Sequence, residues 1–357
     1  MSKYMENART AFEKLREKKD VVILAIESSC DETAVSVVKN GREVLSNIVA
    51  SQIDIHKKFG GVVPEVASRN HVMAISGCYK EALKEAGISE NEIDAIAVTY
   101  GAGLIGALLV GINFAKTLAY ALNLPLIAVS HVHGHISANY LSHPSLKPPF
   151  VCLMVSGGHT ALLSVNDYTK ISLIGSTVDD SVGECFDKVA RVLGLSYPGG
   201  PNIDRLAKEG QNTIKFNYHE PLKDTFNFSF SGLKTAVVNF VHNSEQAGRE
   251  FNKADVAFSF QEIVTDELSE KAVKCCLKED SKTLVVAGGV GANSKLREKL
   301  KEKCEKENIT VFFPDLKYCT DNAAMIGSMA YYYLKSNIGL SDLTLTGKPN
   351  VPISIDE

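Results

Sequence analysis

The chain has 357 residues, which is long enough for two lobes that each bury a hydrophobic core. Its 38 lysines and arginines against 42 aspartates and glutamates give a formal net charge of -4, so any contact with tRNA or DNA must use a local basic patch or a partner's surface. We expect a cytoplasmic protein with no membrane contact, because apolar runs of about eighteen residues, a cleavable leader and paired CxxC cysteines are all missing.

The first half of the chain predicts an N-terminal lobe over residues 21–130. Residues 1–20, which precede it, are highly charged and predict a solvated helix or a disordered extension without a chemical role. Asn113 and Lys116 interrupt the apolar stretch 103–122, which favours a buried crossover helix over a membrane span. The expected strands are 21–26, 33–38, 43–49, 93–98 and 126–130, and the expected helices are 64–86 and 103–122.

The second half predicts a C-terminal lobe over residues 131–345, whose last helix packs across both lobes, followed by an irregular tail over 346–357. Its opening repeats that of the first half: a strand, a small polar turn, Thr-Ala and a returning strand. A duplicated unit of strands and helices predicts an α/β protein with a cleft between two lobes. The expected strands are 150–155, 160–165, 283–287 and 311–313, and the expected helices are 180–193, 202–209, 231–242, 254–277, 294–307 and 322–335.

His131 and His135 are candidate metal ligands. They open an amphipathic segment directly after an apolar strand, and residues four apart lie on one face of a helix, whereas His133 would point elsewhere. Imidazole is a common ligand of zinc and ferrous iron, and two histidines with one carboxylate leave coordination positions open for a substrate. The alternative is a histidine-rich helix start whose rings cap backbone groups.

Three turns of small residues directly follow strands and predict a nucleotide site. They lie at residues 28–31, 156–158 and 288–291. Glycine lets backbone N–H groups approach phosphate oxygens, and the third turn also precedes a helix whose N-terminus favours an anion. Three such turns in a duplicated chain indicate a nucleotide held between two lobes, the alternative being three incidental bends.

Several carboxylates have two possible roles that spacing does not separate. Asp321 either caps the last helix or completes a metal site with the histidine pair. Asp187 either accepts hydrogen bonds from ligand hydroxyls or pairs with Arg191. Gly200 and Asp204 either face the cleft or serve as turn and cap.

Nine ordered motifs between about residues 23 and 335 resemble the bacterial form of the tRNA N6-adenosine threonylcarbamoyltransferase family. The resemblance implies an actin/Hsp70/sugar-kinase-like (ASKHA) α/β fold with two lobes, a duplicated lobe and an interlobe active-site cleft. It also implies transfer of the threonylcarbamoyl group from threonylcarbamoyl-AMP to the N6 amine of the adenosine next to the anticodon, in tRNAs that read codons beginning with A. The motifs lie at residues 27–33, 64–69, 131–135, 155–160, 183–188, 197–201, 228–234, 288–293 and 320–323.

The resemblance also assigns roles to residues and names partners. It implies one divalent metal ion per subunit, iron (Fe2+) or zinc (Zn2+), held by His131, His135 and Asp321. The polar first loop contains two candidate catalytic residues, Glu32 and Asp31, of which Glu32 is the candidate general base, with solvent or the phosphate as alternatives. The implied partners are tRNA, a paralogue of the same fold that lacks the metal site, and a small P-loop ATPase. The implied substrate contacts are Ser29, Met154, Val155, Ser156, Gly157, Gly158, Asp187, Gly200, Asp204 and Asn293.

Three other classes of protein remain as alternatives. A helix-borne zinc protease is disfavoured because Val132 stands where that motif requires a glutamate. An ATP-dependent kinase or ATPase of the same fold would lack the paired histidines. A non-catalytic, nucleotide-bound scaffold would differ only in forming no product.

Overall fold

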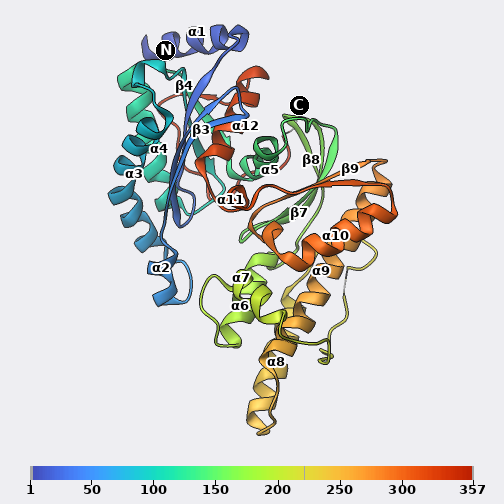
Figure 1. The fold of residues 1–357 in the computed structure, drawn as a ribbon. Helices are drawn as coiled ribbons and strands as arrows, with labels where there is room; N and C mark the ends of the chain where they lie inside the picture. The colour runs from blue at the N-terminus through green and yellow to red at the C-terminus, as the bar shows by residue number, and fades with distance from the viewer. Residues whose placement is uncertain (1–2, 221, 356–357) are drawn as a thin grey trace.

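The computed structural model describes residues 3–220 and 222–355. In this part of the chain the strands form two sheets, each with helices packed against it (Figure 1). The first sheet has the order β11-β5-β4-β1-β2-β3, in which β1 to β3 run antiparallel while β4 and β5 run parallel to β1. Its strands are β1 (Val22–Glu27), β2 (Glu32–Lys39), β3 (Glu43–Ser51), β4 (Ala95–Gly101), β5 (Leu126–Ser130) and β11 (Leu340–Ser341).

The second sheet repeats the pattern of the first and confirms the predicted duplication. Its order is β10-β9-β6-β7-β8, with an antiparallel β6-β7-β8 meander and β9 and β10 parallel to β6. Strand β8 was not predicted, because it lies at the sheet edge and mixes polar with apolar residues on its exposed surface. The strands are β6 (Phe150–Val155), β7 (Thr160–Asp167), β8 (Lys170–Ser176), β9 (Thr283–Ala287) and β10 (Thr310–Phe312).

The predicted long helices are present, with ends that shift by a few residues. Strand β11 pairs with β5, so the chain returns to the first sheet after completing the second. The predicted lobe boundaries, at residues 130 and 345, stay predictions. The α-helices are α1 (Lys3–Glu17), α2 (Ile53–His56), α3 (Pro64–Ala86), α4 (Ile105–Leu122), α5 (His131–Ser142), α6 (Val182–Val192), α7 (Gly199–Ala207), α8 (Ser231–Gln246), α9 (Lys253–Lys278), α10 (Ser294–Lys306), α11 (Leu316–Cys319) and α12 (Ala323–Lys335).

Helix α1 corrects the expectation of a solvated or disordered extension. Tyr4, Ala8, Phe12 and Leu15 recur at helical spacing and are all buried, so one stripe of this charged helix belongs to the core. The ammonium group of Lys335 donates to carbonyls at the end of α1, where a cation complements the helix dipole.

Helix α4 is the one helix in the described residues that is long and apolar enough to cross a membrane, judged by length and composition. One face of it, which includes Leu108 and Ile112, is buried and belongs to the core that also contains residues of β1 and β4. The other face is more open, with Ile105 45% and Tyr120 64% exposed. The predicted packing of this helix is therefore correct for one face only.

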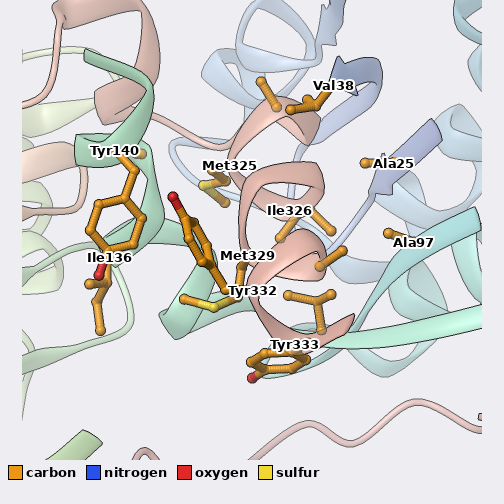
Figure 2. Packing of buried hydrophobic residues seen from close by; sticks show 14 of the residues in the cluster. Ala25, Val38, Ala97, Ile136, Tyr140, Met325, Ile326, Met329, Tyr332 and Tyr333 are labelled. Carbon is orange, nitrogen blue, oxygen red and sulfur yellow. The ribbon is translucent and has the colours of Figure 1, made fainter. Parts of the chain in front are cut away.

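Helices α5 and α12 pack against each other between the sheets. Figure 2 shows Met325, Met329 and Tyr332 of α12 next to Ile136 and Tyr140 of α5. Helix α12 also contacts β1 and β2, while α5 contacts β6 and β9. Residues 131–140 of α5 are consequently buried on every side, which corrects the prediction of an amphipathic segment.

We predict that Gly327→Ala destabilises the fold by about 1–3 kcal/mol, because a Cβ there would lie 2.8 Å from Val38 Cγ2. Chemical denaturation followed by circular dichroism measures the free energy of unfolding. The matched control is Gly77→Ala on α3, where a Cβ meets nothing within 4 Å and added helix propensity gains about 0.5–1 kcal/mol. Equal effects of the two substitutions would contradict the packing described for α12.

Candidate active site

A cavity of about 840 Å³ lies where β1, β4, β6 and β9 end and α5 begins. Ligands of open α/β sheets bind at such carboxyl ends, because loops and helix N-termini converge there. All three predicted turns contribute residues to this one cavity. The predicted site residues that line it are Ser29, Asp31, Glu32, His131, Ser156, Gly157, Gly158, Asp187, Gly200, Asp204, Asn293 and Asp321.

Three predicted site residues do not line the cavity. Met154 and Val155 lie within β6, have no exposed surface and pack in the hydrophobic cores on the two sides of the second sheet. They can shape the loop that follows, but their side chains are not presented to a ligand. His135 lies one helical turn behind His131 and is 2% exposed.

The side chains of His131, His135 and Asp321 converge, although nearly 190 residues separate the carboxylate from the histidines. One donor atom from each lies within 4.8 Å of the others. Oδ1 of Asp321 lies 3.5 Å from His131 Nε2 and 3.2 Å from His135 Nε2. The two imidazole rings meet edge to face, with centroids 4.6 Å apart. His133, as predicted, points elsewhere.

Asp321 does not cap the last helix. The N-cap of α12 is Asn322, whose Oδ1 accepts from Met325 N at 3.0 Å. The expected capping role is therefore filled by the neighbouring residue, which leaves the Asp321 carboxylate to face the histidines.

The donor set fits a divalent metal ion. Both ring nitrogens of His135 are buried and have no hydrogen-bond partner in the described residues, and the 3.2 Å approach to Asp321 lacks hydrogen-bond geometry. An unpaired buried nitrogen costs free energy unless something binds it. Two imidazoles and one carboxylate facing a cavity are the ligand types that zinc and ferrous iron take, with positions left open.

A buried carboxylate, Glu27, holds the first histidine. Its Oε2 lies 3.0 Å from His131 Nδ1 and accepts from Thr99 Oγ1 at 2.6 Å, and its Oε1 accepts from Ser29 N. An Nδ1–H that donates to Glu27 leaves the Nε2 lone pair directed toward Asp321, the tautomer that a metal ligand needs.

The charges around His131 favour a cation. Burial lowers the pKa of His131, but the negative charges of Asp321 and Glu27 outweigh burial and raise it to about 9. Burial raises the pKa of Asp321, but the two histidines outweigh it and lower the pKa to about 2. The centre thus stabilises positive charge, carried by a proton or by a metal ion.

The polar first loop has a different electrostatic environment. Burial, together with the charges of Asp321 and Asp31, raises the pKa of Glu32 to about 10. A carboxyl group with this pKa is protonated at neutral pH, which opposes a role as general base. Asp31 accepts from the Tyr197 hydroxyl at 3.2 Å, a contact between the two halves of the chain.

Asp187, Asp204 and Asn293 combine structural contacts with their place on the cavity wall. Asp187 Oδ1 accepts from Gly199 N at 2.6 Å, and Asp204 Oδ1 accepts from Ser294 Oγ at 2.8 Å. Asn293 is the N-cap of α10. Asp204 and Asn293 thus hold the start of α10, and Arg191 donates to the carbonyl of Gly60 where a pair with Asp187 was the alternative. All three side chains nevertheless border the cavity.

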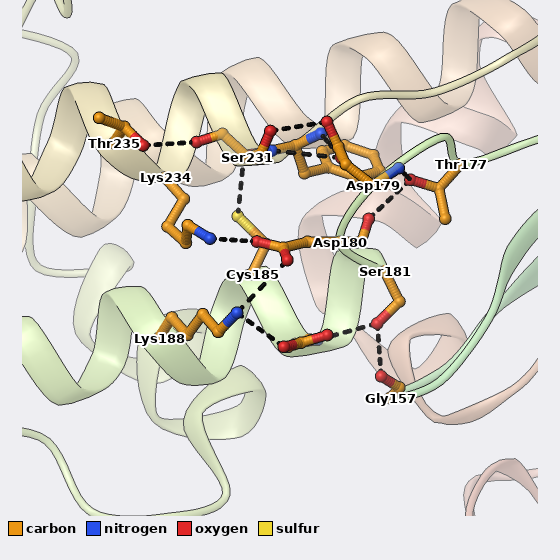
Figure 3. Close-up of polar contacts among 12 residues, drawn as sticks. Gly157, Thr177, Asp179, Asp180, Ser181, Cys185, Lys188, Ser231, Lys234 and Thr235 are labelled. Atoms are coloured by element: carbon orange, nitrogen blue, oxygen red, sulfur yellow. Dashed lines mark hydrogen bonds and ion pairs between the residues drawn. The ribbon is translucent and has the colours of Figure 1, made fainter.

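Helices α6 and α8 support the glycine turn after β6 (Figure 3). Ser181 Oγ donates to the carbonyl of Gly157, and Asp180 next to it pairs with Lys188 and Lys234. Asp179 accepts from Phe230 N at 2.8 Å and Ser231 Oγ at 2.7 Å at the start of α8. The motif at 228–234 is thus a support for the turn.

Three residues at or behind the cavity wall were missed in the sequence. Glu27 was detectable as a charged residue at the end of an otherwise apolar strand. His159 and Tyr197 line the cavity, and burial, with the nearby His131 and His135, lowers the pKa of His159 to about 4. Both lie within motifs that carry the family resemblance, at 155–160 and 197–201, but neither was assigned a role there.

We predict that Glu27→Gln weakens metal affinity by about 10- to 100-fold, because His131 loses the charged partner that fixes its orientation and tautomer. Competition with a chromogenic chelator for Zn2+ measures this affinity. Glu81→Gln, on the exposed surface of α3, is the matched control. Unchanged zinc affinity in Glu27→Gln would remove this residue from the centre.

Known sequences are similar to this chain over most of its length. The family model of tRNA N6-adenosine threonylcarbamoyltransferase matches residues 43–328. A protein of that name from Clostridium perfringens is 58% identical over 335 residues, covering 92% of this chain and 97% of its own length. Another from Clostridium novyi is 55% identical over 340 residues, covering 94% of this chain and 98% of its own length.

Solved structures that are similar share the fold at low sequence identity. HypF from T. kodakarensis has a TM-score of 0.62 at 15% identity, covering 91% of this chain and 49% of that chain. Component A of the Acidaminococcus fermentans (R)-2-hydroxyglutaryl-CoA dehydratase has a TM-score of 0.52 at 12% identity, covering 88% and 99%. These neighbours confirm the predicted actin-like fold class. The sequence matches go further: the chain belongs to the tRNA N6-adenosine threonylcarbamoyltransferase family and is a transferase that modifies adenosine in tRNA.

Proposed function

We propose that the cavity at the carboxyl ends of the strands is the place of transfer from threonylcarbamoyl-AMP to the N6 amine of the adenosine next to the anticodon, in tRNAs that read codons beginning with A. One observation carries the proposal: the His131, His135 and Asp321 cluster adjoins the same cavity as the glycine turns. A centre for activating an acyl group and a cradle for its phosphate leaving group are thereby adjacent.

The second-sheet side of the cavity would hold the adenylate. Gly157, Gly158 and Gly289 bring backbone close to the cavity, and Arg205 and Lys208 on the same wall supply positive charge for a phosphate. Asp187 and Asp204 border this side, where carboxylates suit ribose or threonyl hydroxyl groups. Ser29, Ser156, Gly200 and Asn293 complete the proposed substrate contacts.

His131, His135 and Asp321 would hold one Fe2+ or Zn2+. Such an ion supplies Lewis-acid polarisation of the carbamoyl oxygen. The chain's own residues do the rest: Glu27 accepts from Nδ1–H of His131 and so orients Nε2 toward the centre, and the turns hold the phosphate while the amine attacks. Positioning and preorganised charge of this kind lower a barrier by several kcal/mol, on the order of 5, without a covalent enzyme intermediate.

The transfer forms a bond from N6 to the carbamoyl carbon and breaks the bond from that carbon to the AMP phosphate oxygen. The amine proton leaves to a base. The departing phosphate fits this role better than Glu32, whose pKa burial and the neighbouring Asp321 and Asp31 raise to about 10. Asp31, held by Tyr197, is the second candidate in the first loop.

We predict that His131→Ala and His135→Ala each abolish stoichiometric metal binding and reduce transfer to tRNA by at least about 100-fold, since the centre loses one of its ligands. Metal analysis by mass spectrometry and nucleoside analysis of digested tRNA measure the two effects. His143→Ala, outside the cavity, is the control. Full transfer by a metal-free double variant would reject the proposed centre.

We propose a cytoplasmic location and two protein partners, a metal-site-lacking paralogue and a small P-loop ATPase. Apolar side chains are exposed on two helices that pack together: Val72 (59%) and Met73 (83%) on α3, and Ile105 (45%) and Tyr120 (64%) on α4. We assign the paralogue to these helices, since exposed apolar residues favour a protein partner.

We predict that Met73→Glu prevents stable association with the paralogue, because the new carboxylate would be buried in an apolar interface. Size-exclusion chromatography of the mixed proteins measures association. Lys80→Glu, also exposed on α3, is the control for added negative charge. Undiminished association of Met73→Glu would place the partner elsewhere.

A further inference from the structure

The C-terminal segment 347–355 lies beyond the part of the chain that the family model matches. It belongs to the stretch that was expected to be an irregular tail. In the structure it contains no helix or strand, but it is hydrogen-bonded to both sheets, and part of it reaches the cavity.

The first half of the segment is bound to the first sheet. Lys348 N donates to Tyr100 O at 2.8 Å, and Gly103 N donates to Pro349 O at 3.1 Å. The fit at the end of β4 is close: a Cβ on Gly101 would lie 2.4 Å from Lys348 O and 2.7 Å from Val351 Cγ1. Glycine at 101 is therefore required for the segment to lie where it does.

The second half is bound to α5 and to the edge of the second sheet. Leu173 N donates to Ser354 Oγ at 3.1 Å, and Ile355 N donates to Ile171 O at 3.0 Å. His133 Nε2 donates to Ile353 O at 2.6 Å, while its Nδ1 accepts from the Tyr333 hydroxyl. The middle histidine of the motif at 131–135 thus anchors this segment, and the outer two face Asp321.

Between these anchors, Pro349 and Asn350 form part of the cavity wall. They adjoin the loop Ala102–Leu104, on the side of the first sheet, while the glycine turns after β6 and β9 are on the side of the second. His131 and Asp321 line the same cavity. The segment is held at both ends and on both sheets, so Asn350 has a fixed place in the wall.

We propose that Asn350 is a substrate-contacting residue that reads the base of the acceptor adenosine. The inference rests on the proposed function, in which the second-sheet turns hold the adenylate and leave the first-sheet side for the acceptor. The side-chain amide of asparagine can accept a hydrogen bond from N6–H of adenine through Oδ1 and donate one to N7 through Nδ2. Such a contact would orient the amine that attacks.

The test is steady-state kinetics of the metal-loaded, full-length chain in the transfer reaction, with tRNA and threonylcarbamoyl-AMP varied separately. For Asn350→Ala we expect the KM for tRNA to rise about three- to tenfold, the worth of a hydrogen bond or two, with the KM for the adenylate unchanged. Asn350→Asp keeps the size and shape of the side chain but removes its N–H donor, so we expect the same rise in the KM for tRNA. This second variant decides the question if Asn350→Ala lowers the stability of the fold. Asn91→Ala, at the opposite end of β4, is the matched control.

An unchanged KM for tRNA in both variants would overturn the proposal, as would a rise in the KM for the adenylate alone. Asp187→Asn separates this result from a failure of the proposed function. If that variant leaves the KM for the adenylate unchanged, the assignment of the donor side is wrong, whatever Asn350 does.

Discussion

The packing of α12 on α5 is the constraint on which the candidate centre depends. Asp321 lies two residues before α12, and His131 and His135 lie in the first turns of α5, so the distance between carboxylate and imidazoles follows from how the two helices meet. They approach closely at Gly134, where a Cβ would lie 2.7 Å from Ile326 Cδ1, and Ser137 Oγ donates to Met325 O at 2.6 Å. Rigid helices buried on most sides hold such a geometry better than loops do.

The buried charges follow from the same arrangement. Glu27 has no exposed surface, and a buried carboxylate is stable only when it is paired and hydrogen-bonded. Thr99 near the end of β4, the Ser29 amide in the turn after β1 and His131 at the start of α5 supply these contacts. The negative charge of Glu27 that favours a cation is therefore held in place by the first sheet, because its parallel strands end at the same edge.

The fold alone does not set the function. HypF and the dehydratase component share the architecture at 12–15% identity, so the scaffold hosts different proteins. In this chain the strand ends carry paired histidines after β5, Asp321 before α12 and glycine turns after β6 and β9. Asp179, Asp180 and Ser181 support this site by connecting α8 and α6 to the turn at Gly157.

The sequence by itself determined most of the helices and strands and much of the chemistry, because hydrophobic periodicity and residue spacing are local properties. It predicted the duplicated sheets, the shared face of His131 and His135, and the divergence of His133. It did not decide whether Asp321 caps the last helix or binds a metal ion. It also assigned no role to α1, Glu27 or the C-terminal segment. Those depend on contacts between residues far apart in the chain: Asn322 takes the cap, α1 buries its stripe, and residues 347–355 are bound to both sheets. Only the tertiary structure decides such contacts, since burial and hydrogen-bond partners arise from packing that no local pattern encodes.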